Sequence, residues 1–342
     1  MLKSLAAVLS LASAAGWVTS TRAPARRSLR ARAARAALDD DAVATWIGER
    51  GLGAVSDKTS LGGSGWASFA RYTTEDQRAF FVKTATRSAK EMFEGEALGL
   101  MAMYNASESA DGDGLTIPRV YGAEDLAGGR GSFICMDYLQ LGGRGDQRAL
   151  GRAVARLHLA PPDAAANPDG LFGFPVDNTI GGTPQPNAWM ADWVAFFRER
   201  RMDHQVALAG DGALDSLWAK IAPRLDELFD DVQGAAGPIA PSILHGDLWS
   251  GNIASVKGSP SIYDPACYYG HHEAEWGMSW CAGFGQGFWA GYRELVPESP
   301  RFKDRRPLYE AYHQLNHYNM FGGGYLGSTY RCLEQVKKAL DK

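Results

Sequence analysis

The chain has 342 residues, and 45% of them are hydrophobic, which is enough for a large buried core. No run of apolar residues is long enough to span a bilayer, so we expect no transmembrane segment. The four cysteines show no paired spacing, which argues against a zinc site and a disulfide framework. They are Cys135, Cys267, Cys281 and Cys332.

The first 38 residues differ in composition from the rest. They contain no Asp or Glu, but they contain Lys3 and six arginines among many alanines and serines. This composition is typical of a targeting segment, and its first part also resembles a signal-peptide core that ends at Ala12-Ser13-Ala14. A signal followed by a transit-like segment predicts delivery to a chloroplast or another plastid. A mitochondrial presequence and a basic tail for an acidic partner are the alternatives.

Without this segment the chain is strongly acidic. Seven of the 35 basic residues lie in it, which leaves 28 basic against 39 acidic residues and a net charge of −11. Such a surface repels phosphate backbones, so we expect no nucleic-acid partner.

The folded part is predicted to begin with a helix that follows three aspartates at residues 39–41 and ends at Gly51. Two strand-like segments come next, at residues 55–60 and 67–73. The loop between them reads Leu61-Gly62-Gly63-Ser64-Gly65. A glycine-rich hairpin by itself is usually a plain turn, but its backbone amides can also face phosphate oxygens.

A lysine and a helix with two glutamates follow. The strand-like residues 79–82 lead to Lys83, and the helix predicted for residues 90–105 carries Glu94 and Glu96. Kinases hold the α- and β-phosphates with a lysine on the third strand that pairs with a glutamate on the next helix. Lysines at strand ends are usually solvated, so Lys83 supports this interpretation only in combination with other signals.

The middle of the chain is less specific. Residues 132–136 form an apolar strand, and residues 150–158 have the apolar spacing of a core helix. Residues 160–187 are rich in Pro, Gly, Asn and Asp and are too long for a simple connection. Amphipathic helices are predicted for residues 189–205 and 214–229.

The strongest chemical signal lies at residues 244–252, which read Leu-His-Gly-Asp-Leu-Trp-Ser-Gly-Asn. Asp247 is followed five residues later by Asn252, and Asp264 ends a short apolar run downstream. Kinases use this spacing to bring a base and two metal ligands together. Asp247 would accept the proton of a substrate hydroxyl, while Asn252 and Asp264 would share Mg²⁺. Turn chemistry explains either half alone but not both at this spacing, so phosphoryl transfer is the leading hypothesis.

The same residues carry a family resemblance. His-Gly-Asp-Leu-Trp-Ser-Gly-Asn, followed by Tyr263-Asp264-Pro265-Ala266, resembles the fructosamine-3-kinase family, also called ketosamine or protein-ribulosamine 3-kinases. This family is related to the aminoglycoside phosphotransferases. The resemblance covers the chain after about residue 40. Further similar segments are Met92 to Ala97, Phe172 to Pro175, Thr183 to Asn187, Asp192-Trp193, Asn316 to Asn319 and Phe321 to Tyr325.

The resemblance implies an α+β, two-lobed protein-kinase-like fold. Its N-lobe would be small and β-rich with one main helix, and its C-lobe larger and helical. We therefore expect a targeting segment at residues 1–38, a nucleotide-binding N-lobe at residues 39–137, and a C-lobe with the catalytic loop and acceptor site at residues 138–342.

The resemblance also implies the nucleotide site. The helix glutamate of the family falls at Glu96 rather than Glu94, so Glu96 is the expected partner of Lys83. The hinge between the lobes falls at residues 136–139, where backbone groups would hold adenine. The expected cofactor-binding residues are Gly62, Gly63, Ser64, Gly65, Lys83, Glu96, Met136, Asp137, Tyr138 and Leu139.

One departure from the family lies in the glycine loop. Many members carry a cysteine there, but no cysteine lies between Leu61 and Tyr72, and Trp66 occupies the far side of the loop. We therefore do not expect redox switching through this loop.

Three residues are the expected acceptor contacts. Trp249 comes two residues after the base, where its ring would form an apolar wall for the sugar carbons and the lysine stem. The alternative for Trp249 is loop packing. His271 and Glu273 lie past the metal aspartate, where they would reach the sugar hydroxyls or the amine.

The implied enzyme uses ATP and Mg²⁺ to phosphorylate the 3-hydroxyl of a ketosamine, a sugar adduct on a lysine amine. Phosphorylation makes the adduct prone to elimination, which regenerates the amine and so repairs the protein. The substrates would be glycated proteins, glycated lysine or small glycated amines, and both ribulosamine and fructosamine stay open. The rivals are a small-molecule kinase of the aminoglycoside or choline type and a pseudokinase that only binds nucleotide. The retained Lys83, Asp247, Asn252 and Asp264 argue against the pseudokinase.

Overall fold

The structure is a computed structural model that describes residues 41–108, 114–129, 131–163, 166–167, 169–232 and 239–342. The expected targeting segment, residues 1–38, lies outside the described residues. Among the helices in the described ranges, none is both long and apolar enough to cross a membrane.

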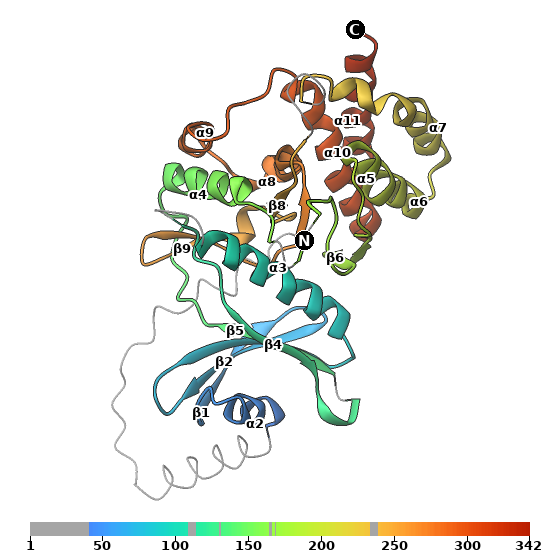
Figure 1. The fold of residues 1–342 in the computed structure, drawn as a ribbon. Coiled ribbons are helices and arrows are strands. Elements are labelled where there is room, and N and C mark those ends of the chain that lie inside the picture. The colour runs from blue at the N-terminus through green and yellow to red at the C-terminus, as the bar shows by residue number, and fades with distance from the viewer. Residues whose placement is uncertain (1–40, 109–113, 130, 164–165, 168, 233–238) are drawn as a thin grey trace, which may run out of the picture. The chain divides into compact units, whose positions relative to one another are not determined.

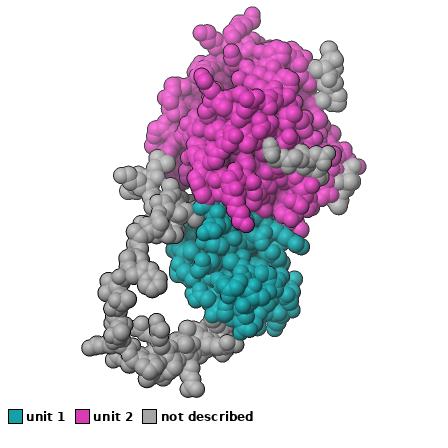
Figure 2. All heavy atoms as spheres, turned by 90° about the vertical axis from the view of Figure 1, so that its left-hand side faces the viewer, with its two compact units in different colours: residues 1–97, 118–141 teal, residues 98–117, 142–342 magenta. Residues whose placement is uncertain are grey.

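The chain divides into two compact units, drawn as ribbons in Figure 1 and coloured separately in Figure 2. Unit 1 runs to residue 97 and includes residues 118–141, and unit 2 consists of residues 98–117 and 142–342. The lobe boundaries expected from the sequence stay a prediction.

Unit 1 is a five-stranded antiparallel sheet in the order β1-β2-β3-β5-β4. The strands are β1 (Val55–Gly63), β2 (Ala67–Thr74), β3 (Ala79–Ala85), β4 (Val120–Asp125) and β5 (Ser132–Asp137). Its helical elements are α2 (Ala42–Glu49), the first part of α3 (Lys90–Glu108) and the short turn η1 (Ala127–Gly129).

Helix α2 begins where the sequence predicts. The Asp41 carboxylate accepts hydrogen bonds from the backbone N–H groups of Val43 at 3.0 Å and Ala44 at 3.1 Å, which satisfies donors that have no partner within the helix. The apolar face of α2 packs on one face of the sheet. This core consists of Val43, Ala44, Trp46, Ile47, Tyr72, Phe80, Val82, Phe133 and Cys135. Successive side chains of a strand point to opposite faces, so Lys83 projects from the other face of β3.

Unit 2 is mainly helical. Besides the end of α3 it contains α4 (Gln147–Leu159), α5 (Trp193–Phe196), α6 (His204–Ala209), α7 (Gly212–Ile221), α8 (Ser279–Ala282), α9 (Gln286–Arg293), α10 (Phe302–Phe321) and α11 (Tyr325–Leu340). Shorter helical turns are η2 (Phe197–Asp203, π-helical), η3 (Ala222–Leu228), η4 (Ser250–Asn252) and η5 (His272–Met278). Three antiparallel strand pairs complete it: β6 (Asn178–Ile180) with β7 (Thr183–Gln185), β8 (Ser242–Leu244) with β11 (Tyr268–Gly270), and β9 (Ile253–Val256) with β10 (Ser259–Ile262).

The helix predicted for residues 189–205 begins later than expected. Met190 is extended and pairs with Phe172, and the Asp192 side chain accepts a hydrogen bond from the Ala195 N–H at 2.7 Å, so Asp192 caps α5. A contact with a distant segment therefore competes with the helical periodicity of residues 189–192.

The β9–β10 hairpin brings the two predicted metal ligands together. Its register pairs Ile253 with Ile262, and the Tyr263 N–H donates to the Asn252 carbonyl at 3.2 Å. Asn252 directly precedes β9 and Asp264 follows β10 by two residues, so both lie at the open end of one hairpin.

Candidate active site

In unit 1 the predicted glycine loop is the tip of the β1–β2 hairpin. Gly62 pairs with Phe69 and Gly63 with Ser68. The Ser64 N–H donates to the Ala67 carbonyl at 2.8 Å, and the Ser64 hydroxyl accepts from the Ala67 N–H at 3.2 Å. Because this hydroxyl closes the turn, any phosphate contact of the tip would come mainly from backbone amides.

The predicted lysine–glutamate pair is formed. Lys83 Nζ lies 2.7 Å from Glu96 Oε1, and both side chains are about nine-tenths buried. Glu94, two residues earlier on α3, is exposed. The Glu96 carboxylate of α3 thus holds the Lys83 ammonium group in one position.

At the predicted hinge, two backbone donors are already used within unit 1. The Asp137 N–H donates to the Arg119 carbonyl at 2.9 Å, and the Tyr138 N–H donates to the Ala79 carbonyl at 3.1 Å. The next N–H, that of Leu139, has no acceptor among the described residues. The expected contact of this donor with adenine stays a prediction.

In unit 2 the segment that carries Asp247 is a tight loop between β8 and η4. Gly246 has φ +77°, in the left-handed region that favours glycine, and a Cβ there would collide with the Ala266 carbonyl oxygen. The Ala266 N–H donates to the His245 carbonyl at 2.9 Å. The loop thus lies directly against the segment that follows Asp264.

Asn252 connects the two aspartates. Its side-chain Nδ2 donates to the Asp247 carbonyl at 2.9 Å and to the Asp264 carbonyl at 3.2 Å, and it lies 3.5 Å from Asp247 Oδ2. Because the amide nitrogen is used by these oxygens, the atom that remains to bind a cation is Oδ1. Asp264 has φ +62°, which is rare for a residue other than glycine and is typical of functional sites.

The charge state of the loop follows from burial. Burial and the nearby charges of Asp264 and Glu275 raise the pKa of Asp247 well above its ordinary value, which suits a proton acceptor. Burial lowers the pKa of His245, so this ring is neutral. Its Nδ1 accepts from the Asp247 N–H at 3.2 Å, so the proton lies on Nε2, which donates to the Tyr263 carbonyl at 2.9 Å.

Trp249 fits both interpretations that the sequence offers. Its indole ring packs over Gly251, where a Cβ would collide with the ring carbons. The side chain nevertheless stays partly exposed. Trp249 therefore packs the loop with one part of its ring and leaves another part accessible.

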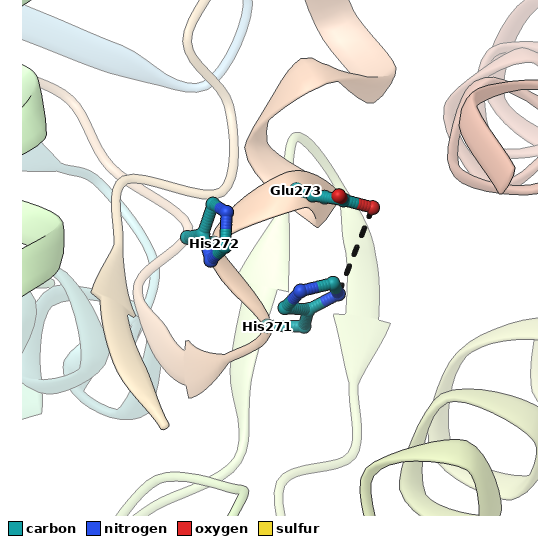
Figure 3. A group of neighbouring side chains, drawn as sticks. All are labelled: His271, His272 and Glu273. Atoms are coloured by element: carbon teal, nitrogen blue, oxygen red, sulfur yellow. Dashed lines mark ion pairs between the residues drawn. The ribbon is translucent and has the colours of Figure 1, made fainter. Parts of the chain in front are cut away.

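His271 and Glu273 are buried in unit 2, where His271 Nδ1 lies 4.0 Å from a carboxylate oxygen of Glu273 (Figure 3). His271 Nδ1 lies 2.9 Å from the Tyr309 hydroxyl. The Glu273 carboxylate accepts from Arg305 Nε at 2.7 Å and from a second guanidinium nitrogen at 3.0 Å. This geometry gives no support to the predicted acceptor contacts of the two residues, which stay a prediction.

The ligand atoms of His271, His272 and Glu273 lie within 4.8 Å of one another, close enough to hold a metal ion (Figure 3). However, the Arg305 guanidinium already neutralises the Glu273 carboxylate, and a metal cation would meet that charge at short range. The arrangement therefore favours a buried ion pair over a metal site.

Two histidines with strongly lowered pKa values, the partly buried His272 and the buried His313, predict a loss of stability in mild acid. Burial lowers the pKa of both His272 and His313 to about 3, so both rings are neutral in the folded protein. The unfolded chain binds protons near pH 6.5, so the free energy of unfolding should fall from pH 7 to pH 5 by about 2 kcal/mol for each ring. Denaturant unfolding at both pH values measures this. His313→Gln should show a smaller fall, and an equal fall in parent and variant would exclude His313 from the effect.

The sequence did not single out the polar residues that brace the site from the β6–β7 hairpin. Asn178 Nδ2 donates to the Cys267 carbonyl at 2.8 Å, and Gln185 Nε2 donates to the Ala266 carbonyl at 3.2 Å. The Tyr312 hydroxyl donates to Gln185 Oε1 at 2.6 Å. The available signals were the long polar segment that contains Asn178 and Gln185 and the family-similar segment Thr183 to Asn187, and neither indicated hydrogen bonds to residues 266 and 267.

The sequence model of the fructosamine kinase family matches residues 42–339. The chain belongs to the fructosamine kinase family. Among its relatives is the chloroplastic protein-ribulosamine 3-kinase of Oryza sativa subsp. japonica, 44% identical over 331 residues that cover 93% of this chain and 92% of the relative. The family predicted from the catalytic-loop motif is therefore confirmed, and with it the predicted class of enzyme.

Solved structures confirm the fold. A Thermobifida fusca protein assigned as a fructosamine-3-kinase has a TM-score of 0.70 and 25% identity, covering 88% of this chain and 99% of its own. An aminoglycoside phosphotransferase bound to AMP-PNP and hygromycin B has a TM-score of 0.51 and 16% identity, with coverage of 88% and 98%. The chain thus has the predicted α+β protein-kinase-like fold.

Proposed function

We propose that this fructosamine kinase is a protein-ribulosamine 3-kinase, which uses ATP to phosphorylate the 3-hydroxyl of ketosamines on lysine amines. The observation that carries the proposal is the cluster in which the Asn252 amide connects Asp247 and Asp264. The family match and the name of the rice relative support the choice of substrate. Both the family and the fold are those of phosphotransferases, which supports ATP as the donor.

In the proposed reaction, the oxygen of the sugar hydroxyl forms a bond to the γ-phosphorus of ATP. Asp247 accepts the proton that this hydroxyl loses. The bond from this phosphorus to the oxygen that bridges it to the β-phosphate breaks, and ADP leaves with that oxygen. Lys83, held by Glu96, would bind the phosphates of the nucleotide.

Asn252 Oδ1 and the Asp264 carboxylate are the proposed Mg²⁺ ligands. Both are hard oxygen donors, which Mg²⁺ prefers. Mg²⁺ would neutralise the phosphate charge, and a cation on Asp264 would also offset the negative charge near Asp247.

A side-by-side assay of acceptors tests the function. ATP consumption would be measured with a ribulosyl-lysine, a fructosyl-lysine, choline and an aminoglycoside. We expect turnover with ribulosyl-lysine and none with choline or the aminoglycoside. Turnover with choline or the aminoglycoside alone would assign a small-molecule kinase, and nucleotide binding without turnover of any acceptor would assign a pseudokinase.

Trp249 provides a prediction about the acceptor. Trp249→Ala should raise the Michaelis constant for ribulosyl-lysine and leave that for ATP unchanged, because the accessible part of the ring would contact the sugar. Gly251→Ala should act in the same direction, since its Cβ would displace the indole. Equal losses for both substrates, or a lowered melting temperature with unchanged kinetics, would instead assign Trp249 to loop packing.

We also propose that the protein acts in plastids on glycated proteins or glycated small amines. The rice relative is named chloroplastic and aligns with 93% of this chain. The acid-free, arginine-rich composition of residues 1–38 supports the same destination.

A further inference from the structure

The face of the unit 1 sheet that carries Lys83 also carries an arginine, Arg71. The register pairs Arg71 of β2 with Phe81 of β3, and Phe81 lies two residues before Lys83. Paired residues share a face, and so do alternate residues of one strand, so Arg71 and Lys83 project from the same face. Tyr72, the residue after Arg71, lies in the core on the opposite face, where α2 packs.

Two rows of side chains cross this face of the sheet. In the first, the lysine row, Phe69 pairs with Lys83, which pairs with Ile134, and Phe69 also pairs with a glycine of the hairpin tip. The second, the hinge row, lies two residues further along each strand, at a distance of about 7 Å, and ends at the predicted hinge. Arg71 is the one charged residue of the hinge row. This row consists of Thr59, Arg71, Phe81 and Met136.

The Arg71 guanidinium is held beside the hinge. Its Cζ lies 5.4 Å from the centre of the Tyr138 ring, in a cation–π contact, and its Nη2 lies 3.4 Å from Thr59 Oγ1. Its Nε is buried and has no acceptor among the described residues. Buried donors in folded proteins nearly always have an acceptor, so this group is suited to a ligand that supplies one. The protein thus positions the guanidinium without using all of its donors.

We propose that Arg71 contacts the purine base of the bound nucleotide, with the plane of its guanidinium stacked on the ring of the base. This inference rests on the proposed function, in which Lys83 binds the phosphates, and on the predicted hinge at residues 136–139. A nucleotide bound in this way runs from the lysine row to the hinge row, so its base, and not its phosphates, meets Arg71. Guanidinium groups stack on aromatic rings and are attracted to their π-electrons.

Binding of ATP and of inorganic tripolyphosphate separates a base contact from a phosphate contact. Arg71→Met removes the charge and the planar group, whereas Arg71→Lys keeps the charge and removes only the planar group. We expect the dissociation constant of ATP, measured by calorimetry with Mg²⁺, to rise about tenfold in Arg71→Met and at least about threefold in Arg71→Lys. Tripolyphosphate should bind to Arg71→Lys as it does to the parent. It should bind to Arg71→Met no more than about threefold more weakly, because only a distant charge is lost.

Three results would overturn the proposal. Equal losses for ATP and tripolyphosphate would show that Arg71 contacts the phosphates. ATP affinity in Arg71→Lys equal to that of the parent would show that only the charge matters. The third result concerns 2′-deoxy-ATP, which should lose as much affinity as ATP does in Arg71→Met. If Arg71→Met instead binds 2′-deoxy-ATP as tightly as the parent does, Arg71 contacts the ribose hydroxyl and not the base.

Arg78→Met is the matched control. Arg78 is an exposed arginine of unit 1, at the turn between β2 and β3, and it pairs with Asp76 at 2.9 Å. This variant should bind ATP and tripolyphosphate as the parent does. If a melting curve shows that Arg71→Met does not fold, Arg71→Lys decides alone with the same two ligands. These assays need no acceptor, so the inference can hold even if no ketosamine is a substrate, whereas a parent that binds no ATP would overturn both the inference and the proposed function.

Discussion

Asp247→Asn is expected to lower turnover by ~10² to 10⁴ and to leave ATP binding nearly unchanged, because the amide keeps the shape of the side chain but accepts no proton. The loop should keep its conformation. The Asn252 side chain donates at 2.9 Å to the backbone carbonyl of residue 247, which the substitution does not alter. The measurements are turnover with ribulosyl-lysine and the dissociation constant of ATP by calorimetry.

The control for this variant is Asp230→Asn, which makes the same chemical change at an exposed aspartate. It should retain the turnover of the parent. Turnover of Asp247→Asn within a factor of two of the parent would reject Asp247 as the base. A large loss accompanied by weaker ATP binding would instead indicate a collapsed site.

Short-range patterns predicted which of the proposed site residues lie close together, although their chemical roles stay predictions. The spacing from Asp247 to Asn252 and Asp264 required only that a hairpin follow Asn252, and the β9–β10 register supplies it. Lys83 and Glu96 meet because strand alternation places Lys83 on the face of the sheet that carries α3. In both cases the distance along the chain is small, and elements that are neighbours in the sequence determine the geometry.

The features that the sequence did not predict depend on contacts between residues far apart in the chain. Glu275 meets the loop 29 residues before it through backbone N–H groups, which leave no mark on the side-chain pattern. Met190 lies in helical periodicity but is extended because it pairs with Phe172. The sequence predicted that Glu273 contacts the substrate. Its carboxylate instead forms a buried ion pair with Arg305, which lies 32 residues later in the chain.

Asp264→Asn is expected to weaken ATP binding in the presence of Mg²⁺ by about 10- to 100-fold or more. A loss of this size is typical when a residue that only supports a metal ligand is removed, so the loss of a ligand itself should be no smaller. Asparagine suits this position because Asp264 has φ +62°, and asparagine tolerates the left-handed region better than alanine does. The substitution therefore removes the charge with little cost to the backbone. ATP dissociation constants with and without Mg²⁺ measure the effect.

Asp264→Ala separates charge from backbone strain. It removes the ligand and also places a residue without a polar side chain in the left-handed conformation, so its melting temperature should fall below that of Asp264→Asn. Both variants should lose most of the difference in ATP affinity that Mg²⁺ makes in the parent. Equal ATP affinity with and without Mg²⁺ in the parent would contradict the assignment of Asp264 as a metal ligand. The assignment would also be contradicted if Mg²⁺ changed the ATP affinity of Asp264→Asn as much as that of the parent, because the carboxylate charge would then not be what binds the ion.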